Sequence, residues 1–198
     1  MLLNHKILKE VSPDVIREAA GDLRMLGKNN TITFESENKT AYLQDRAVYD
    51  IERQGKRSVE NYLEKYANTV SSMERRLLEA MSNAFYSLFT VEKIRKGAGA
   101  DIADVFSGEK LFLADINLSR TLPEGCLLSC RVISLDGLNF TSGCACIFEK
   151  KQLISLKDNF VNLFEKNKDT LSWREMMRKY NPYFLKMMKQ SGKEVWFL

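Results

Sequence analysis

The chain has 198 residues, of which 44% are hydrophobic and 28% are charged. This composition is close to the globular average and argues against a disordered chain. No apolar run reaches the roughly 18–20 residues of a membrane span. The formal net charge is +4 and is unevenly spread, since residues 149–198 carry 11 Lys/Arg against 6 Asp/Glu, a net of +5. An anionic partner would be attracted to this last quarter of the chain.

Residues 1–89 show mainly helical spacing of apolar side chains. The start Met1–Lys6 has no apolar core of the kind found in secretory signals, so we expect a cytoplasmic protein with reduced thiols. Capping residues and the 3.6-residue period predict helices from Ser12 to Gly27, over residues 40–54, from Ser58 through Tyr66, and from Ser71 or Ser72 through Leu88.

Residues 90–149 change to short β-rich runs separated by turn residues. The runs lie at 91–94, 101–106, 110–115, 126–135 and 138–148, and Asp136-Gly137 is a strong hairpin signal. These features predict a compact five-stranded β-unit. Because short turns dominate, we expect an antiparallel sheet or a small barrel, covered on both faces of the last hairpin.

Residues 150–198 return to helical spacing and are basic. One helix is predicted around Leu153–Phe164. A second carries a stripe of methionine and aromatic side chains from Trp173 to Met188, and Pro182 is expected to kink or restart it. We expect these amphipathic helices to pack back on the rest of the protein, although a partner-binding arm is the alternative. The predicted fold class is therefore α+β.

The cysteines and the single histidine do not form a recognisable metal or catalytic site. Pairing Leu135 with Leu138 places Cys130 opposite Gly143 and Cys144 opposite Ser129, so that the two cysteine pairs, 126/130 and 144/146, face opposite ways. Four converging thiolates are then excluded, and we predict no zinc, no cofactor and no disulfide. His5 lies in a segment expected to be unanchored.

Five cations are the candidate binding residues: Arg120 and Arg131 on the β-unit, with Arg174, Arg178 and Lys179 in the basic C-terminal region. Lysine and arginine side chains contact phosphates in nucleic-acid complexes. The same side chains on a solvated helix face, without a ligand, are the alternative explanation. No residue is assigned a catalytic role or a metal.

The order of several short motifs resembles a family of uncharacterised bacterial proteins, many of which carry the zinc motif of the SecA C-terminus. The similar pieces are Glu60-x-Tyr62-Leu63, Glu74-Arg75, Ser87-Leu88-Phe89-x-Val91, Asp104–Glu109, Ser119-x2-Leu122-x2-Gly125, Arg131 and Ser142-Gly143. They cover about half of the chain. The zinc motif itself is missing, because Cys144-Ala145-Cys146 has no following Gly-Ser-Gly and no later Cys-Cys or Cys-His. The resemblance implies a bacterial cytoplasmic protein without an assigned activity.

Three functions remain open at this point. The first is a non-enzymatic binding or regulatory module, with the β-unit as an interaction barrel and a protein as the expected partner. The second is a nucleic-acid-binding protein that uses the basic C-terminus together with Arg120 and Arg131. The third is an enzyme that uses only carboxylates, namely Asp101, Asp104, Glu109 and Asp115. Self-association is left open.

Overall fold

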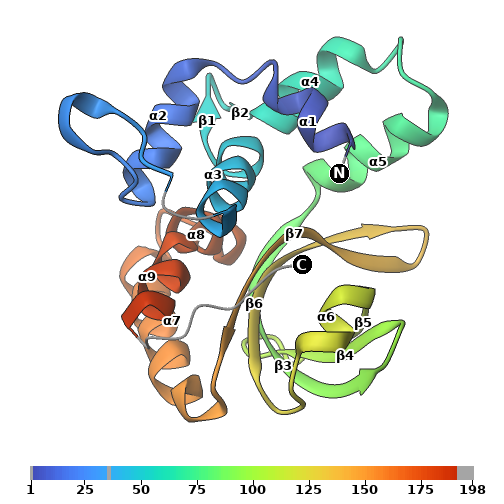
Figure 1. The fold of residues 1–198 in the computed structure, drawn as a ribbon, viewed down its shortest axis with the longest axis vertical. Coiled ribbons are helices and arrows are strands. Elements are labelled where there is room, and N and C mark those ends of the chain that lie inside the picture. Colours follow the sequence, from blue (N-terminus) through green and yellow to red (C-terminus); the bar gives the residue numbers. More distant parts are fainter. Residues whose placement is uncertain (1, 35–36, 191–198) are drawn as a thin grey trace. The chain divides into compact units, whose positions relative to one another are not determined.

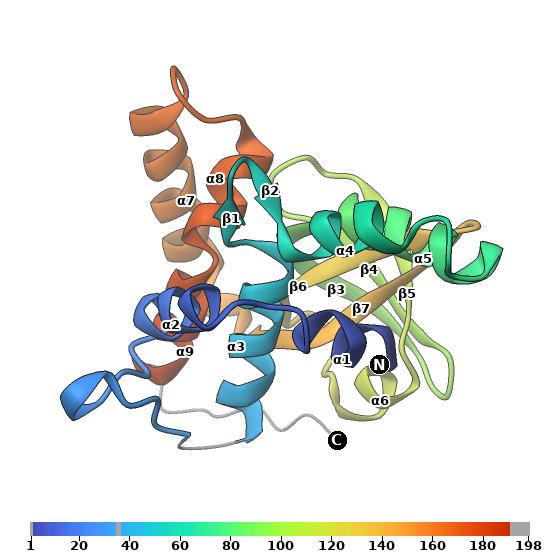
Figure 2. The ribbon, with the colours of Figure 1, turned by 90° about the horizontal axis from the view of Figure 1, so that it is seen from above.

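The computed structural model describes residues 2–34 and 37–190, and the chain divides into two units, Met1–Ala84 and Phe85–Leu198. The first unit is helical and the second contains the barrel and the C-terminal helices (Figures 1 and 2). None of the helices within the described ranges combines the length and the apolar character needed to cross a membrane.

The helical unit contains five helices among its described residues and one two-stranded hairpin. Its elements are α1 Leu2–Leu8, α2 Pro13–Asp22, a 3-10 turn at Lys28–Asn30, α3 Glu37–Tyr49, β1 Glu52–Arg53, β2 Lys56–Arg57, α4 Ser58–Tyr66 and α5 Ser72–Ser82. Helix α1 corrects the expectation of an unanchored start. Ile7 is fully buried, and the Tyr49 hydroxyl donates to Asn4 Oδ1 at 3.0 Å, while His5 stays exposed.

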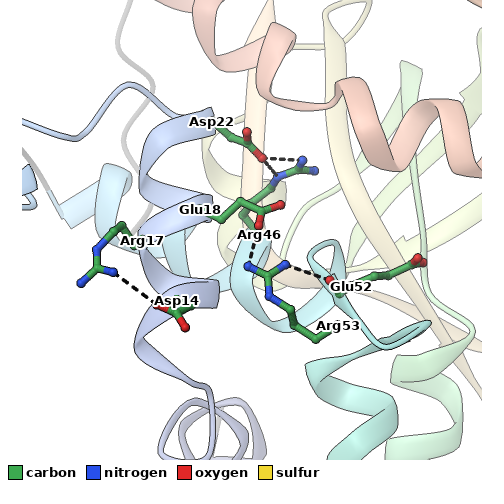
Figure 3. Close-up of polar contacts among 7 residues, drawn as sticks. All are labelled: Asp14, Arg17, Glu18, Asp22, Arg46, Glu52 and Arg53. Carbon is green, nitrogen blue, oxygen red and sulfur yellow. Dashed lines mark hydrogen bonds and ion pairs between the residues drawn. The ribbon is translucent and has the colours of Figure 1, made fainter.

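A row of ion pairs joins α2 to its neighbours in the helical unit. Arg46 of α3 donates to Asp22 through Nε at 3.0 Å and Nη2 at 2.7 Å, and Arg53 of the hairpin pairs with Glu18 at 2.6 Å (Figure 3). Arg17 pairs with Asp14 at 3.2 Å on the same helix. The acids of α2 therefore help to position α3 and the hairpin.

The predicted helix over residues 40–54 is too long. Helix α3 ends at Tyr49, and the chain then turns back through Gln54 and Gly55, whose φ angles of 55° and 77° match a two-residue type I′ hairpin turn. The polar run from Glu52 to Arg57 has no apolar face that would hold it against a core as a helix, which explains the change.

The predicted helix from Ser72 to Leu88 is also too long. Its start is confirmed, because Ser71 accepts a hydrogen bond from the Glu74 amide at 3.2 Å in a capping box. It ends at Ser82, and β3 begins at Phe85. Residues 86–89 are all buried, as expected of a strand covered on both faces, and such a continuous apolar run also fits helical spacing.

The predicted α+β fold with a small barrel is confirmed. The strands β3 Phe85–Arg95, β4 Gly99–Asp104, β5 Lys110–Ala114, β6 Leu127–Leu135 and β7 Leu138–Phe148 close in the order β3-β4-β5-β7-β6. All pairs are antiparallel except β5 with β7, which run parallel at Leu113 and Asn139. The parallel pair arises because α6, Ile116–Thr121, carries the chain across the barrel between β5 and β6.

The barrel wall carries a register shift that corrects two predicted pairings. Leu135 pairs with Leu138 as predicted, but an irregularity between Cys130 and Val132 places Cys130 opposite Ala145 and Ser129 opposite Cys146. Each of these two residues pairs two positions further along β7 than predicted. Because side chains alternate with a period of two, each cysteine keeps the side of the sheet predicted for it. Cys126 and Cys130 belong to the cluster of buried side chains inside the barrel, together with Phe89, Ile102 and Leu113.

The C-terminal helices pack on the barrel within the second unit. They are a 3-10 turn at Lys150–Gln152, α7 Leu153–Asn167, α8 Trp173–Tyr180 and α9 Pro182–Gln190, so Pro182 restarts the helix as predicted. The fully buried Phe184 lies 4.3 Å from Phe160, 5.7 Å from Tyr86 and 6.1 Å from Phe148 between ring centroids. The aromatic stripe is therefore part of the core of this unit. The side chains of Met188 and Lys189 lie outside those that the structure describes.

Candidate ligand-binding face of the barrel

The outer face of β3, β4 and β5 forms a shallow hollow of about 420 Å³. Side chains alternate along each strand, so Ile102 and Leu113 point into the core. Cross-strand partners Lys93–Asp101 and Asp101–Phe112 share the outer side. We call this surface the barrel face; it consists of Glu92, Lys93, Arg95, Asp101, Lys110 and Phe112.

Two backbone features shape the barrel face. The register shift between Val91 and Lys93 is a bulge that turns Glu92 and Lys93 to the same side of β3. Gly99 allows β4 to approach β5 closely, because a Cβ at this position would lie 1.9 Å from the carbonyl oxygen of Leu113. Gly97 and Ala98 lie in the turn that connects β3 to β4, and Gly99 is the first residue of β4.

Paired charges and one aromatic ring occupy the centre of the barrel face. Arg95 donates two hydrogen bonds to Asp101, at 2.9 and 2.6 Å, and its guanidinium carbon lies 4.7 Å from the centroid of the Phe112 ring. Lys110 pairs with Glu92 at 2.8 Å. The planar guanidinium therefore covers the half-buried ring and is held in place by a bidentate carboxylate.

Three cations at one end of the barrel face have no hydrogen-bonded or ionic partner in the described part of the chain. They are Lys93 on β3, Lys96 in the following turn and Arg120 on α6, and all three are exposed. The Gly97 amide donates to Ser119 Oγ at 3.0 Å, which fixes α6 beside the turn. Lys96 and Arg120 each lie next to one of these bonded residues, so both are near the β3–β4 turn, where the Glu124 carboxylate also accepts a hydrogen bond from the Ile94 amide at 2.8 Å.

The five cations predicted from the sequence do not form one site. Arg120 lies at the end of the barrel face. Arg131 is only 1% exposed and lies 5.5 Å from the Tyr86 ring, so it belongs to the barrel wall. Arg174, Arg178 and Lys179 lie on α8, where Arg174 covers the Phe85 ring at 5.5 Å and Lys179 lies over Tyr180 at 5.4 Å.

Lys93, Lys96 and Phe112 were not predicted as site residues. The outward position of Lys93 depends on the bulge between Val91 and Lys93, and such a bulge cannot be predicted from the residue types alone. Lys96 could have been found, because it precedes the Gly97-Ala98-Gly99 turn, and turns that flank a barrel face often carry ligand contacts. Alternation along β5 also places Lys110 and Phe112 together on one side.

The four carboxylates considered for catalysis are positioned by turns and ion pairs. Asp101 pairs with Arg95, and Asp104 accepts hydrogen bonds from the amides of Phe106 and Ser107 at 2.8 and 2.9 Å. Asp115 caps α6 at the Leu118 amide and accepts from the Thr141 hydroxyl. Glu109 is exposed beside the turn into β5. These contacts give each of the first three acids a structural role.

The cysteines are four separate, buried thiols. Burial raises the pKa of Cys126 to about 11. Within residues 2–34 and 37–190, no three His, Cys, Asp or Glu side chains gather in a way that could hold a metal ion.

The strand order describes the class of barrel. It is a closed five-stranded barrel of order 1-2-3-5-4, with a helix between its third and fourth strands and a parallel pair of its third and fifth strands, and in this it is similar to the oligonucleotide/oligosaccharide-binding (OB) type of barrel. The chain belongs to a family of unknown function (DUF7986), whose family model matches residues 1–197. Neither the curated proteins nor the solved structures contain a match to the chain.

Proposed function

We propose that the protein is a non-enzymatic binding module of a bacterial cytoplasm, and that its barrel face binds single-stranded nucleic acid. The observation that carries this proposal is the group of three uncompensated cations, Lys93, Lys96 and Arg120, beside the Arg95–Phe112 stack. OB-type barrels bind oligonucleotides or oligosaccharides on the face of their second and third strands, which here are β4 and β5. The comparison with OB-type barrels is an analogy of fold. The three cations are the feature of this chain that favours a nucleic acid as the ligand.

The barrel face offers both contacts that a single strand needs. Lys93, Lys96 and Arg120 would contact phosphates, and such contacts give affinity without sequence preference. The Arg95 guanidinium lies over the Phe112 ring, and together they would provide a platform on which a base can stack. Stacking of this kind contributes about 1–3 kcal/mol per base. The Arg95–Asp101 pair keeps the platform in position.

A protein partner was the first expectation from the sequence and becomes the alternative here. A protein-docking surface would favour one continuous apolar patch of a few hundred Å². The strongly exposed apolar side chains described in the barrel unit are instead spread over α6, β7 and α7, at Ile116, Leu138, Ile154 and Val161. The cysteines are buried thiols rather than disulfides, which supports the proposed reducing compartment. The sequence resemblance to bacterial proteins with the SecA-type zinc motif is used here only for the proposed bacterial origin, because the motif itself is missing from this chain.

The proposal is tested by fluorescence anisotropy with a labelled mixed-sequence single-stranded oligonucleotide and the full chain at low salt. The variant Lys93→Gln/Lys96→Gln/Arg120→Gln is expected to bind at least about tenfold more weakly. The matched control Arg174→Gln/Arg178→Gln/Lys179→Gln removes the same number of charges from α8 and is expected to bind like the wild type. Equal loss in both variants, or no binding by the wild type, would contradict the proposal.

A further inference from the structure

A second candidate site lies entirely within the helical unit and is unrelated to the barrel face. It is a pocket of about 490 Å³, which we call the hairpin pocket. Its three walls are residues 7–15 at the end of α1 and the start of α2, residues 51–58 around the β1–β2 hairpin, and residues 61–65 of α4. The volume is in the range of small-molecule sites, about 300–1,000 Å³.

The floor of the hairpin pocket is apolar. Ile7, Val15, Ile51 and Tyr62 line it, and each is 9% exposed or less. These side chains come from α1, α2, the start of the hairpin and α4, so the floor is fixed by the core of the unit. An apolar ligand group that packs on this floor would itself be removed from water, which is the main source of affinity in such sites.

The rim of the hairpin pocket is electrically polarised. The acids Glu10 and Asp14 lie on the wall formed by residues 7–15, whereas Arg53, Lys56 and Lys65 lie on the hairpin and α4. Glu18 and Glu64, the partners of Arg53 and Lys56, are not among the lining residues. The acids of the pocket therefore lie on one wall and the cations on the other two, and one ion pair, between Glu10 and Lys65 at 2.6 Å, joins the acidic wall to α4.

The ion pairs at the rim can exchange with a ligand. Lys65 pairs with Glu10, Lys56 with Glu64 and Arg53 with Glu18, each at 2.6 Å, and all six side chains are more than 40% exposed. Exposed pairs of this kind contribute little to stability, so a charged ligand group can replace one partner at small cost.

Neutral hydrogen-bonding groups complete the lining. Among the described residues, the Asn61 and Gln54 amides and the Ser12 hydroxyl have no side-chain hydrogen-bond partner. Gln54 is held in the left-handed region at φ 55°, a conformation that a side-chain-bearing residue adopts at a cost. These groups can bind the amide of a peptide bond.

We propose that the hairpin pocket binds a short zwitterionic peptide with apolar side chains. Its ammonium group lies on the Glu10/Asp14 wall, its carboxylate lies on the wall of Arg53, Lys56 and Lys65, and its apolar side chains cover the floor. A zwitterion matches the two walls at once, whereas a simple anion or a simple cation would meet one wall of its own sign.

The test is isothermal titration calorimetry of the full chain with leucyl-phenylalanine, its N-acetyl form and its C-terminal amide. The zwitterion is expected to bind at least about tenfold more tightly than either blocked form, because each block removes a charge-assisted hydrogen bond. Glu10→Gln should weaken the dipeptide but not the N-acetyl form, which lacks the ammonium group and gains from the release of Lys65 from its ion pair. Lys56→Gln should weaken the dipeptide and leave the amide unchanged.

Three further variants make the outcome decisive. Lys9→Gln, an exposed charge outside the pocket, should bind the dipeptide like the wild type. Asn61→Ala is a second test variant, because Asn61 lies on the exposed side of α4 and its replacement is not expected to destabilise the fold. It should weaken dipeptide binding, and this result can be interpreted even if Glu10→Gln lowers the melting temperature. The triple variant of the barrel face should keep its dipeptide affinity, so this inference and the proposed function fail separately. Blocked dipeptides that bind as tightly as the zwitterion, or a folded protein that binds none of the three, would overturn the proposal.

Discussion

Two hairpin turns show how a single residue decides local stability. Both turns have two central residues with positive φ, Gln54-Gly55 at 55° and 77° and Asp136-Gly137 at 53° and 78°. Aspartate tolerates the left-handed region because its short side chain can bond to nearby backbone, whereas glutamine gains no such contact. Gln54 is thus the less favourable residue for its turn, and it also lines the hairpin pocket.

We predict that Gln54→Gly stabilises the protein by about 0.5–1 kcal/mol, because glycine removes the cost of the left-handed conformation. The free energy of unfolding, measured with urea, would show this as a higher midpoint at unchanged slope. Asp136→Gly is the matched control and should change stability much less. A Gln54→Gly variant less stable than the wild type would indicate that the glutamine side chain contributes to the fold.

The thiols should be inert in the native protein. All four cysteines are buried, which restricts access of a reagent to their sulfur atoms, and burial raises the pKa of Cys126 to about 11, so almost no Cys126 thiolate is present at neutral pH. We expect Ellman's reagent to react slowly with the native chain and rapidly with four thiols after denaturation. Fast reaction of any cysteine under native conditions would mean that this part of the barrel wall opens readily.

Glu10 should make the stability of the helical unit depend on pH. Hydrogen bonds from Lys65 and Tyr66 lower the pKa of Glu10 below its ordinary value. A carboxylate with a depressed pKa stabilises the folded state above its unfolded pKa, and this stabilisation is lost as the pH falls through the folded pKa. The drop in melting temperature from about pH 7 to about pH 3 should therefore be smaller for Glu10→Gln than for the wild type. Equal drops would leave the Glu10 contacts without a role in stability.

At the scale of elements, the sequence predicted what has a clear local signal. The presence of five strands, the Asp136-Gly137 turn, a helix cap at Ser71 or Ser72 and a kink or restart at Pro182 were predicted, and the structure has the turn, the cap at Ser71 and the restart. The errors lie where two periods fit equally well. Phe85 and Leu88 continue the spacing of α5, yet they lie in a strand whose burial on both faces depends on tertiary contacts.

The candidate site was predictable only in part for the same reason. Arg120 was named from its charge and place. The outward position of Lys93 depends on a bulge, and the burial of Arg131 depends on the packing around β6. Neither can be read from residue types. The hairpin pocket was missed because residues 50–54 were assigned to the end of a helix, although they form the first half of the hairpin that makes one of its walls.

The C-terminal helices should be essential for the fold of the barrel unit. We predict that Phe184→Ala lowers the free energy of unfolding by about 3–5 kcal/mol, because the ring contacts three other rings and is fully buried. Truncation before Leu171 should give an aggregating or partly unfolded protein. Ile154→Ala is the control, since this side chain is 72% exposed, and it should have little effect. A stable monomer after truncation would contradict the core role of α8 and α9.

At the scale of the whole molecule, net charge and the arrangement of charges indicate different candidate binding surfaces. The excess positive charge lies in residues 149–198, and this pattern indicated the C-terminal region. The structure uses part of that charge to cover rings, as with Arg174 over Phe85, whereas uncompensated cations gather at the end of the barrel face. The arrangement of charges therefore matters more than their sum.

The salt dependence of single-strand binding tests the central claim most directly. The logarithm of the affinity should fall linearly with the logarithm of the salt concentration, with a slope of about −0.7 for each phosphate contact. If Lys93, Lys96 and Arg120 contact phosphates, their replacement by glutamine should make the slope shallower by about 2, while the matched α8 variant keeps the slope of the wild type. An unchanged slope in the barrel-face variant, or a shallower slope in the α8 variant alone, would show that the barrel face is not the binding surface.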